Sequence, residues 1–265
     1  MLLSIITINL NNVSGLKKTI NSIQSQTVKD FEYIVIDGNS IDGSVELILE
    51  NKMVFSKVVI EKDTGIFNAM NKGVRMAEGE YLLFLNSGDY LSDANVIENI
   101  IPYLNDYDFI SGDTIFEHET GYIKGTSPHK LTAYVIVRYA LSHQSTFIRT
   151  DLLRKRPYRE DLRIASDWEQ ELYELVFNDA SYRHIPLVVS VFNESGISRT
   201  DEDCVRKERD KIYNEYFSKT LLKALMGENE LKEMTNHIEE GTCHYRWSLF
   251  CLKCIRKFCN LFIWK

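Results

Sequence analysis

The sequence predicts an α/β protein built on a mostly parallel β-sheet with helices on both faces. Three observations support this fold class. The first 90 residues alternate short apolar runs with amphipathic segments at helical spacing. Each apolar run ends at a turn rich in Gly, Asp or Asn. The chain has 265 residues, of which 44% are hydrophobic, so it can bury a large core.

The first 90 residues are expected to supply the parallel strands. The predicted strands are residues 2–8, 31–36, 58–60 and 81–85. The predicted helices between them are one that starts at an N-cap, Ser14, then residues 45–51 and residues 66–77. Sheets of this kind bind ligands outside the carboxyl ends of their strands.

The rest of the chain has a less regular pattern. Its predicted strands are residues 108–111, 114–116, 122–124, 146–148 and 183–192, and residues 131–141 fit either a helix or a strand. The predicted helices are a short one capped by Thr150, residues 166–177, and two charged ones at 201–225 and 228–240. The strand pattern stops near residue 200. We therefore expect a catalytic-type domain at 1–200, a helical extension at 201–240 and a tail at 241–265.

Charge is distributed unevenly along the chain. The net charge of −7 argues against a nucleic-acid partner, which prefers a basic surface. Residues 241–265 carry five basic and no acidic side chains, which leaves −12 on residues 1–240. This tail is rich in large apolar residues but too charged to span a bilayer, so it is predicted to lie on an anionic membrane surface. A helix docked on the protein itself or on a partner in a homodimer is the alternative.

The cysteines and the N-terminal residues indicate the compartment. Four of the five cysteines lie in the last 23 residues, and they are interpreted as free thiols, with half of a zinc site at Cys251 and Cys254 as the alternative. The first residues lack the pattern of a signal peptide. We therefore expect a cytoplasmic protein attached peripherally to the inner face of the plasma membrane.

Acidic turns follow three of the predicted parallel strands. Residues 37–44 follow the second strand, residues 61–65 the third and residues 86–89 the fourth. Each turn alone is a common loop sequence. Because the carboxyl ends of parallel strands share one edge of the sheet, Asp37, Asp63 and Asp89 are expected to lie there together.

An ordered series of motifs carries a family resemblance. The motifs are SIITIN at 4–9, IDGNSIDGS at 36–44, DTGIFNAMNKG at 63–73 and GEYLLFLNSGD at 79–89, with weaker matches at 143–145, 165–169 and 196–198. Over roughly residues 1–200 the chain resembles a family 2 glycosyltransferase of the GT-A fold, a Rossmann-like fold, as found in bacterial polysaccharide and lipopolysaccharide assembly. The resemblance implies an inverting enzyme that moves a sugar from a nucleotide-sugar, expected to be a UDP-sugar, to a hydroxyl of a saccharide acceptor, expected to be lipid-linked.

The resemblance also implies roles for individual residues. Asp167 would be the general base that deprotonates the acceptor hydroxyl, and Asp89 would hold a divalent metal, Mn²⁺ or Mg²⁺. The residues implied in nucleotide-sugar binding are Thr7, Asn9, Asp37, Asp63, Lys72, Asn86 and Ser87. Those implied in loop or acceptor contacts are His143, Glu169 and Arg199. Each also has a structural interpretation: Asp167 as a first-turn helix residue, His143 as a structural histidine, and Lys72, Glu169 and Arg199 as surface charges.

One departure from the family pattern concerns the metal. The usual Asp-x-Asp-Asp stretch is Asn86-Ser87-Gly88-Asp89 here, which leaves one carboxylate of three. The metal is therefore expected to bind weakly until the diphosphate completes its coordination shell. This depletion keeps a second function open, a catalytically silent nucleotide-binding or scaffold protein. A dehydrogenase is disfavoured because Asn9-Leu10-Asn11-Asn12, not a GxGxxG loop, follows the first strand.

Overall fold

The computed structural model describes residues 1–118, 121–193 and 201–225. Within these ranges the strands are β1 (Leu3–Asn9), β2 (Glu32–Asp37), β3 (Lys57–Ile60), β4 (Tyr81–Phe84), β5 (Tyr90–Leu91), β6 (Phe109–His118), β7 (Gly121–Gly125), β8 (Thr146–Arg149) and β9 (Tyr182–Asn193). The helices are α1 (Val13–Gln24), α2 (Ser44–Glu50), α3 (Ile66–Met76), α4 (Val96–Ile100), α5 (Ala133–Arg138), α6 (Thr150–Lys155), α7 (Ser166–Phe177) and α9 (Glu202–Tyr216). The structure also contains three 3₁₀ turns, η1 (Lys52–Val54), η2 (Ile101–Tyr103) and η3 (His143–Ser145), and the described part of the chain ends in helical residues 219–225.

The strands form one sheet in the order β3-β2-β1-β4-β8-β6-β9-β5, with β7 added to β6. β3, β2, β1 and β4 are parallel to one another, as the alternation of the first 90 residues predicts. β8 runs antiparallel to both β4 and β6, and β9 runs parallel to β6. The predicted α/β fold class is confirmed: the sheet contains a parallel half and a mixed half, and helices flank it.

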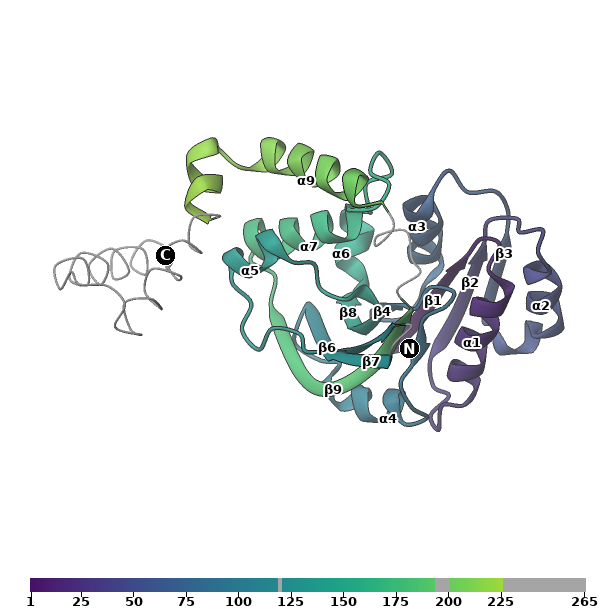
Figure 1. The fold of residues 1–265 in the computed structure, drawn as a ribbon. Helices are drawn as coiled ribbons and strands as arrows, with labels where there is room; N and C mark the ends of the chain where they lie inside the picture. The colour runs from purple at the N-terminus through teal and green to yellow at the C-terminus, as the bar shows by residue number, and fades with distance from the viewer. Residues whose placement is uncertain (119–120, 194–200, 226–265) are drawn as a thin grey trace. The chain divides into compact units, whose positions relative to one another are not determined.

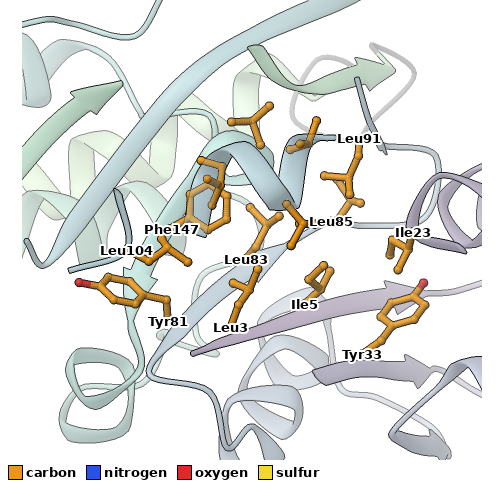
Figure 2. Close-up of a cluster of buried hydrophobic side chains, with 14 of the residues drawn as sticks. Leu3, Ile5, Ile23, Tyr33, Tyr81, Leu83, Leu85, Leu91, Leu104 and Phe147 are labelled. Carbon is orange, nitrogen blue, oxygen red and sulfur yellow. The ribbon is translucent and has the colours of Figure 1, made fainter. Parts of the chain in front are cut away.

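Two apolar layers hold the helices on opposite faces of the parallel strands (Figure 1). On one face α1, α2 and α4 pack on a buried cluster that includes Leu3, Ile5 and Leu83 (Figure 2). On the other face α3 and α6 pack on a cluster that includes Ile6 and Phe84. Because strand side chains alternate between faces and both faces are covered, apolar residues predominate in these strands without a regular polar alternation.

Helix α3 packs closely against β1 at Gly73. A Cβ atom on Gly73 would lie 2.5 Å from Cγ2 of Ile6, a distance that side chains do not tolerate. Glycine at position 73 therefore lets the helix approach the strand. Ile66, Phe67 and Met70, in the first two turns of α3, line the cavity described below.

Several element boundaries differ from the prediction. α1 begins at Val13 because Asn12, rather than Ser14, is its N-cap, and the Asn12 side chain accepts a hydrogen bond from the Gly15 N–H at 3.1 Å. Residues 109–118 form one strand, β6, where two were expected. The Gly112-Asp113 pair suggests a turn, but in the structure it lies at a β-bulge where the pairing with β9 changes register. β5 and α4 were not predicted.

Contacts within the chain divide it into two units, Met1–Ile212 and Tyr213–Lys265. The predicted helix at 228–240, the tail at 241–265 and its four cysteines lie outside the described residues. Cys204 is a free thiol. Across the part of the chain that the structure describes, each helix is too short or too polar to cross a membrane.

Candidate active site

The carboxyl ends of β1 and β2 meet in a hydrogen-bonded polar cluster. Asn9 lies beside Asp37 in the strand register, and its Nδ2 donates to Oδ2 of Asp37 at 2.7 Å. Ser40 donates to the same carboxylate through its backbone N–H at 2.8 Å and its hydroxyl at 2.9 Å. The Asp37 side chain is thus fully buried and satisfied by the protein. Oδ1 of Asn9 is buried without a hydrogen-bond partner among the described residues, which makes it a ready acceptor for a ligand N–H or O–H group.

Asp63 lies next to this cluster, as the strand order predicts. A Cβ atom on Gly38 would lie 3.2 Å from Oδ2 of Asp63, so the two acidic turns are in close contact. Lys72 forms ion pairs with Asp63 at 2.5 Å and with Glu61 at 2.8 Å. Burial lowers the pKa of Lys72, but its hydrogen bonds to Asp63 and Glu61 outweigh burial and raise it. In this arrangement the ammonium group of Lys72 pairs with two carboxylates, and this pairing orients Asp63.

Thr7 is buried within the sheet and does not reach a solvent-facing site. Its hydroxyl donates to the Leu85 carbonyl at 2.7 Å and shares a hydrogen bond with the Tyr33 hydroxyl at 3.2 Å. Its exposed fraction is 0%. Thr7 therefore supports the sheet beneath the site, and the structure does not bring it to a ligand.

A cavity of about 870 Å³ opens beside the polar cluster, where β4 ends. Five of the residues singled out in the sequence line it: Asn86, Ser87, Asp89, His143 and Asp167. They come from three places in the chain, namely the turn after β4, the 3₁₀ turn η3 and the first turn of α7. The structure thus brings together residues more than 50 positions apart in the sequence, as the implied active site requires.

The turn that carries Asp89 is held by side chains from α1 and its cap. Thr19 donates to the Asp89 carbonyl at 2.7 Å and accepts from the Gly88 N–H at 3.1 Å. Asn12 donates to the Ser87 carbonyl at 2.9 Å. Gly88 has φ of +111°, a conformation that favours glycine. Asn12 and Thr19 were not predicted as site residues. The only sequence signal for Asn12 was its place directly after the first strand.

The His143 ring lies between Asn86 and Asp167 and contacts both side chains. Its Nε2 lies 3.2 Å from Nδ2 of Asn86, and its Nδ1 lies 3.2 Å from Oδ2 of Asp167. Burial lowers the pKa of His143, but the hydrogen bond to Asp167 and the charges of Asp167 and Asp89 outweigh it and raise the pKa. Oδ1 of Asn86 is buried without a hydrogen-bond partner among the described residues. Rotating the Asn86 amide would place this oxygen opposite Nε2, where it can accept a hydrogen bond from the doubly protonated imidazole.

This environment gives a testable dependence of stability on pH. A raised pKa means that the protonated His143 stabilises the folded state fully below its ordinary pKa of about 6.5 and loses that effect as the pH rises through the raised value. We therefore expect His143→Gln to lower the free energy of unfolding most at about pH 5.5, and less at about pH 8.5. Urea denaturation at both pH values measures the difference, with the exposed His129→Gln as the control. A deficit that is the same at both pH values would show that His143 does not titrate in this way.

Glu169 does not line the cavity. Glu169 lies two residues after Asp167 on α7 and is fully buried, where it pairs with Arg156 and lies 3.8 Å from Arg159. It is therefore part of a buried ion-pair network rather than a substrate contact on the cavity wall. Arg199 lies outside the described residues.

The single carboxylate of Asp89 suits a divalent cation whose other ligands come mainly from a substrate and from water. Among the described residues no cluster of three or more His, Cys, Asp and Glu side chains could enclose a metal. Asp89 nevertheless places a carboxylate, 95% buried, at the cavity wall. Mg²⁺ in phosphate-binding sites is commonly held by one or two carboxylates together with substrate phosphates and water. One carboxylate therefore fits a metal that arrives with a diphosphate.

Comparison with known proteins identifies the family. The family model described as "Glycosyl transferase family 2" matches residues 4–162, which is more than half of the chain. The chain belongs to glycosyl transferase family 2. A "PGL/p-HBAD biosynthesis glycosyltransferase" of Mycobacterium bovis (strain BCG / Pasteur 1173P2) is 30% identical over 208 residues, covering 76% of this chain and 80% of that protein. An uncharacterized glycosyltransferase of Methanocaldococcus jannaschii, MJ1057, is 26% identical and covers 77% of this chain and 73% of its own length.

Solved structures of glycosyltransferases share the fold. Residues 1–349 of S. aureus TarS in complex with UDP-GlcNAc match with a TM-score of 0.64 and 17% identity, over 86% of this chain and 71% of that one. A longer TarS chain matches over only 43% of its length. Mannosyltransferase PcManGT from Pyrobaculum calidifontis, in complex with GDP-Man and Mn²⁺, matches with a TM-score of 0.55 and 17% identity, over 72% of this chain and 56% of that one. At these identities the structures establish the fold of this family member, and its membership supports a role in glycosyl transfer.

Proposed function

We propose that this family 2 member is an inverting glycosyltransferase that moves a sugar from a UDP-sugar to a hydroxyl of a saccharide acceptor. One observation carries the proposal: Asp89 and Asp167 line the same cavity, and His143 lies between the turn of the first and the carboxylate of the second. The residue proposed to hold the metal and the residue proposed as the base thus line one cavity, whose volume of about 870 Å³ is large enough for a sugar. The TarS complex with UDP-GlcNAc supports the choice of donor.

The donor would lie across the two neighbouring parts of the site. The nucleoside would contact the cluster of Asn9, Asp37 and Asp63, where the buried Oδ1 of Asn9 offers an acceptor for a uracil or ribose hydrogen. The diphosphate would lie at the turn from Asn86 to Asp89. Asp89 would hold Mn²⁺ or Mg²⁺ there, and when bound this ion neutralises charge on the departing diphosphate.

Asp167 would serve as the general base of the transfer. It takes the proton of the acceptor hydroxyl, whose oxygen then forms a bond to the anomeric carbon. The bond from that carbon to the diphosphate oxygen breaks on the opposite face, and UDP leaves with the bonding electron pair. The configuration at the anomeric carbon is therefore inverted. His143 donates to Asp167 at 3.2 Å and so fixes the direction of this carboxylate.

The acceptor and the cellular location belong to the same proposal. We propose that the acceptor is a lipid-linked saccharide and that the enzyme acts as a homodimer in the cytoplasm at the membrane surface. The sequence and the family resemblance are the basis for these three proposals. The basic tail at 241–265 would hold the enzyme at the membrane, and these residues lie outside the described structure.

A donor panel tests this proposed function. UDP-, GDP- and TDP-sugars are first compared for thermal stabilisation of the protein. Release of nucleoside diphosphate is then measured with p-nitrophenyl glycosides as acceptors. Both measurements are made with Mn²⁺, with Mg²⁺ and with EDTA. We expect a UDP-sugar to stabilise the protein most, and UDP release to require the metal. Stabilisation by UDP without release from any donor would instead favour the silent nucleotide-binding protein.

A further inference from the structure

A carboxylate on α9 caps the segment that leads into the helix of Asp167. Glu208 accepts hydrogen bonds from the backbone N–H groups of Ile164 and Ala165, both at 2.9 Å, and from that of Arg163. α7 begins at the next residue, and its N-cap, Ala165, has no side chain that can accept a hydrogen bond. Glu208 therefore satisfies the amide of the N-cap, Ala165, and the amides of the two residues before it, and it does so from 43 to 45 residues away in the sequence.

Other contacts from the same helix hold the surroundings of Asp167. The guanidinium of Arg209 lies 4.4 Å from the ring centroid of Trp168, the residue after Asp167, and its Nη1 donates to the Arg138 carbonyl at 2.7 Å. Arg138 is the last residue of α5, and both arginines line the cavity. The middle of α9 thus contacts two elements of the cavity wall, α5 and α7.

Salt bridges add to the attachment between α9 and the segment before α7. Lys211 pairs with Asp161 at 2.7 Å, and Asp201, just before α9, pairs with Arg163 at 2.7 Å. These side chains are largely exposed, so each pair contributes little to stability by itself. Together with Glu208 they fix one short segment at several points. The helical extension is therefore in direct contact with the active-site domain up to residue 212.

We propose that Glu208 is a positioning residue for glycosyl transfer, which acts by holding the start of α7 and thereby the carboxylate of Asp167. The proposal rests on the proposed role of Asp167 as the base. The carboxylate has three supports: His143 lies 3.2 Å from its Oδ2, the Trp168 N–H donates to its Oδ1 at 2.8 Å, and the backbone of the first turn of α7 sets where the side chain begins. A displacement of about 1 Å between reacting groups is enough to cost a large factor in rate. The donor-binding cluster at Asn9 and Asp37 makes no such contact with Glu208, so donor affinity should not depend on it.

A double-mutant cycle separates positioning from a purely structural role. Glu208→Ala, Asp167→Asn and the double variant are compared in the UDP-release assay, and Glu202→Ala, an exposed glutamate in the first turn of the same helix, is the control. We expect Glu208→Ala to lower kcat about tenfold with an unchanged KM for the donor, and to have little further effect in the Asp167→Asn background. Glu208→Gln, which keeps one acceptor oxygen, should recover part of kcat. If Glu208→Ala does not fold, Glu208→Gln takes its place in the cycle.

Three results would overturn the proposal. The first is a kcat of Glu208→Ala equal to that of the wild type. The second is an equal fall in kcat on adding Glu208→Ala to the wild type and to Asp167→Asn. The third is a rise in the donor KM in place of a fall in kcat. Hydrogen exchange provides a reading that does not need activity: the amides of residues 163–165 should exchange faster in Glu208→Ala than in the wild type, and equal rates would contradict the capping. Wild-type protein that releases no UDP, with protected amides at 163–165, would count against the proposed function but leave the capping intact.

Discussion

Replacing Asp167 with asparagine is expected to lower kcat for transfer at least about a hundredfold, because general-base catalysis contributes roughly 10²–10⁴-fold to such reactions. Asparagine keeps the shape of the side chain and an oxygen that can accept from Nδ1 of His143, but it cannot take a proton at neutral pH. The affinity for UDP should stay within about twofold of the wild type, since the proposed role of Asp167 is toward the acceptor hydroxyl and not toward the nucleotide. UDP release and titration calorimetry measure the two quantities.

The matched control for this variant is Asp203→Asn. Asp203 also lies in the first turn of a helix, α9, but its side chain is 76% exposed and pairs with Arg206 at 2.8 Å at the surface. This variant should retain full activity. A loss of only a few fold in Asp167→Asn would assign Asp167 to the structural role of a first-turn helix residue, and another group would have to accept the proton.

Replacing Asp89 with alanine is expected to abolish the part of UDP affinity that depends on a divalent metal, a loss of about tenfold or more. The turn at 86–89 supplies one carboxylate, so the variant leaves the metal without a charged protein ligand. Titration of UDP in Mn²⁺ and in EDTA separates the metal-dependent part of the affinity. The wild type should differ between the two conditions, and Asp89→Ala should not.

An exposed aspartate in a loop provides the control for Asp89. Asp106→Ala removes a carboxylate at the protein surface and should leave the response to Mn²⁺ unchanged. If Asp89→Ala binds UDP in Mn²⁺ as tightly as the wild type, Asp89 is not the metal ligand. The depleted Asp-x-Asp-Asp stretch would then indicate a transferase that works without a metal at this position.

The parallel part of the fold could be predicted from the sequence because burial leaves a simple pattern. All six residues of β2 are buried, the middle four (33–36) read as an apolar run, and polar turns mark where such strands end. The same logic placed Asp37 and Asp63 at one edge of the sheet, where the structure has them. The second half was harder because β6 and β9 bend and shift register at a bulge, which removes the regular alternation.

The details of the site depended on contacts that no local pattern reveals. Asp167 and Glu169 were both candidates, yet residues two apart on a helix point to different sides, and only Asp167 lines the cavity. Lys72 was a candidate for a phosphate contact, but it pairs with Asp63 across a turn. Glu208 lies in a segment that reads as a solvated charged helix, and its partners are backbone amides more than 40 residues away. Such contacts follow from the folded chain alone.

The stereochemistry of the product tests the central claim most directly. The donor for this test is the UDP-sugar that stabilises the protein most in the panel, with its sugar in the α configuration as in UDP-GlcNAc. Proton NMR can follow its anomeric signal while wild-type protein, Mn²⁺ and an acceptor glycoside are present. An inverting transferase with Asp167 as its base should convert the donor to a β-linked product, and Asp167→Asn should produce it at least about a hundredfold more slowly. An α-linked product would contradict the proposed mechanism. If UDP binds but no UDP-sugar of the panel yields any product, the proposed transferase activity itself is wrong.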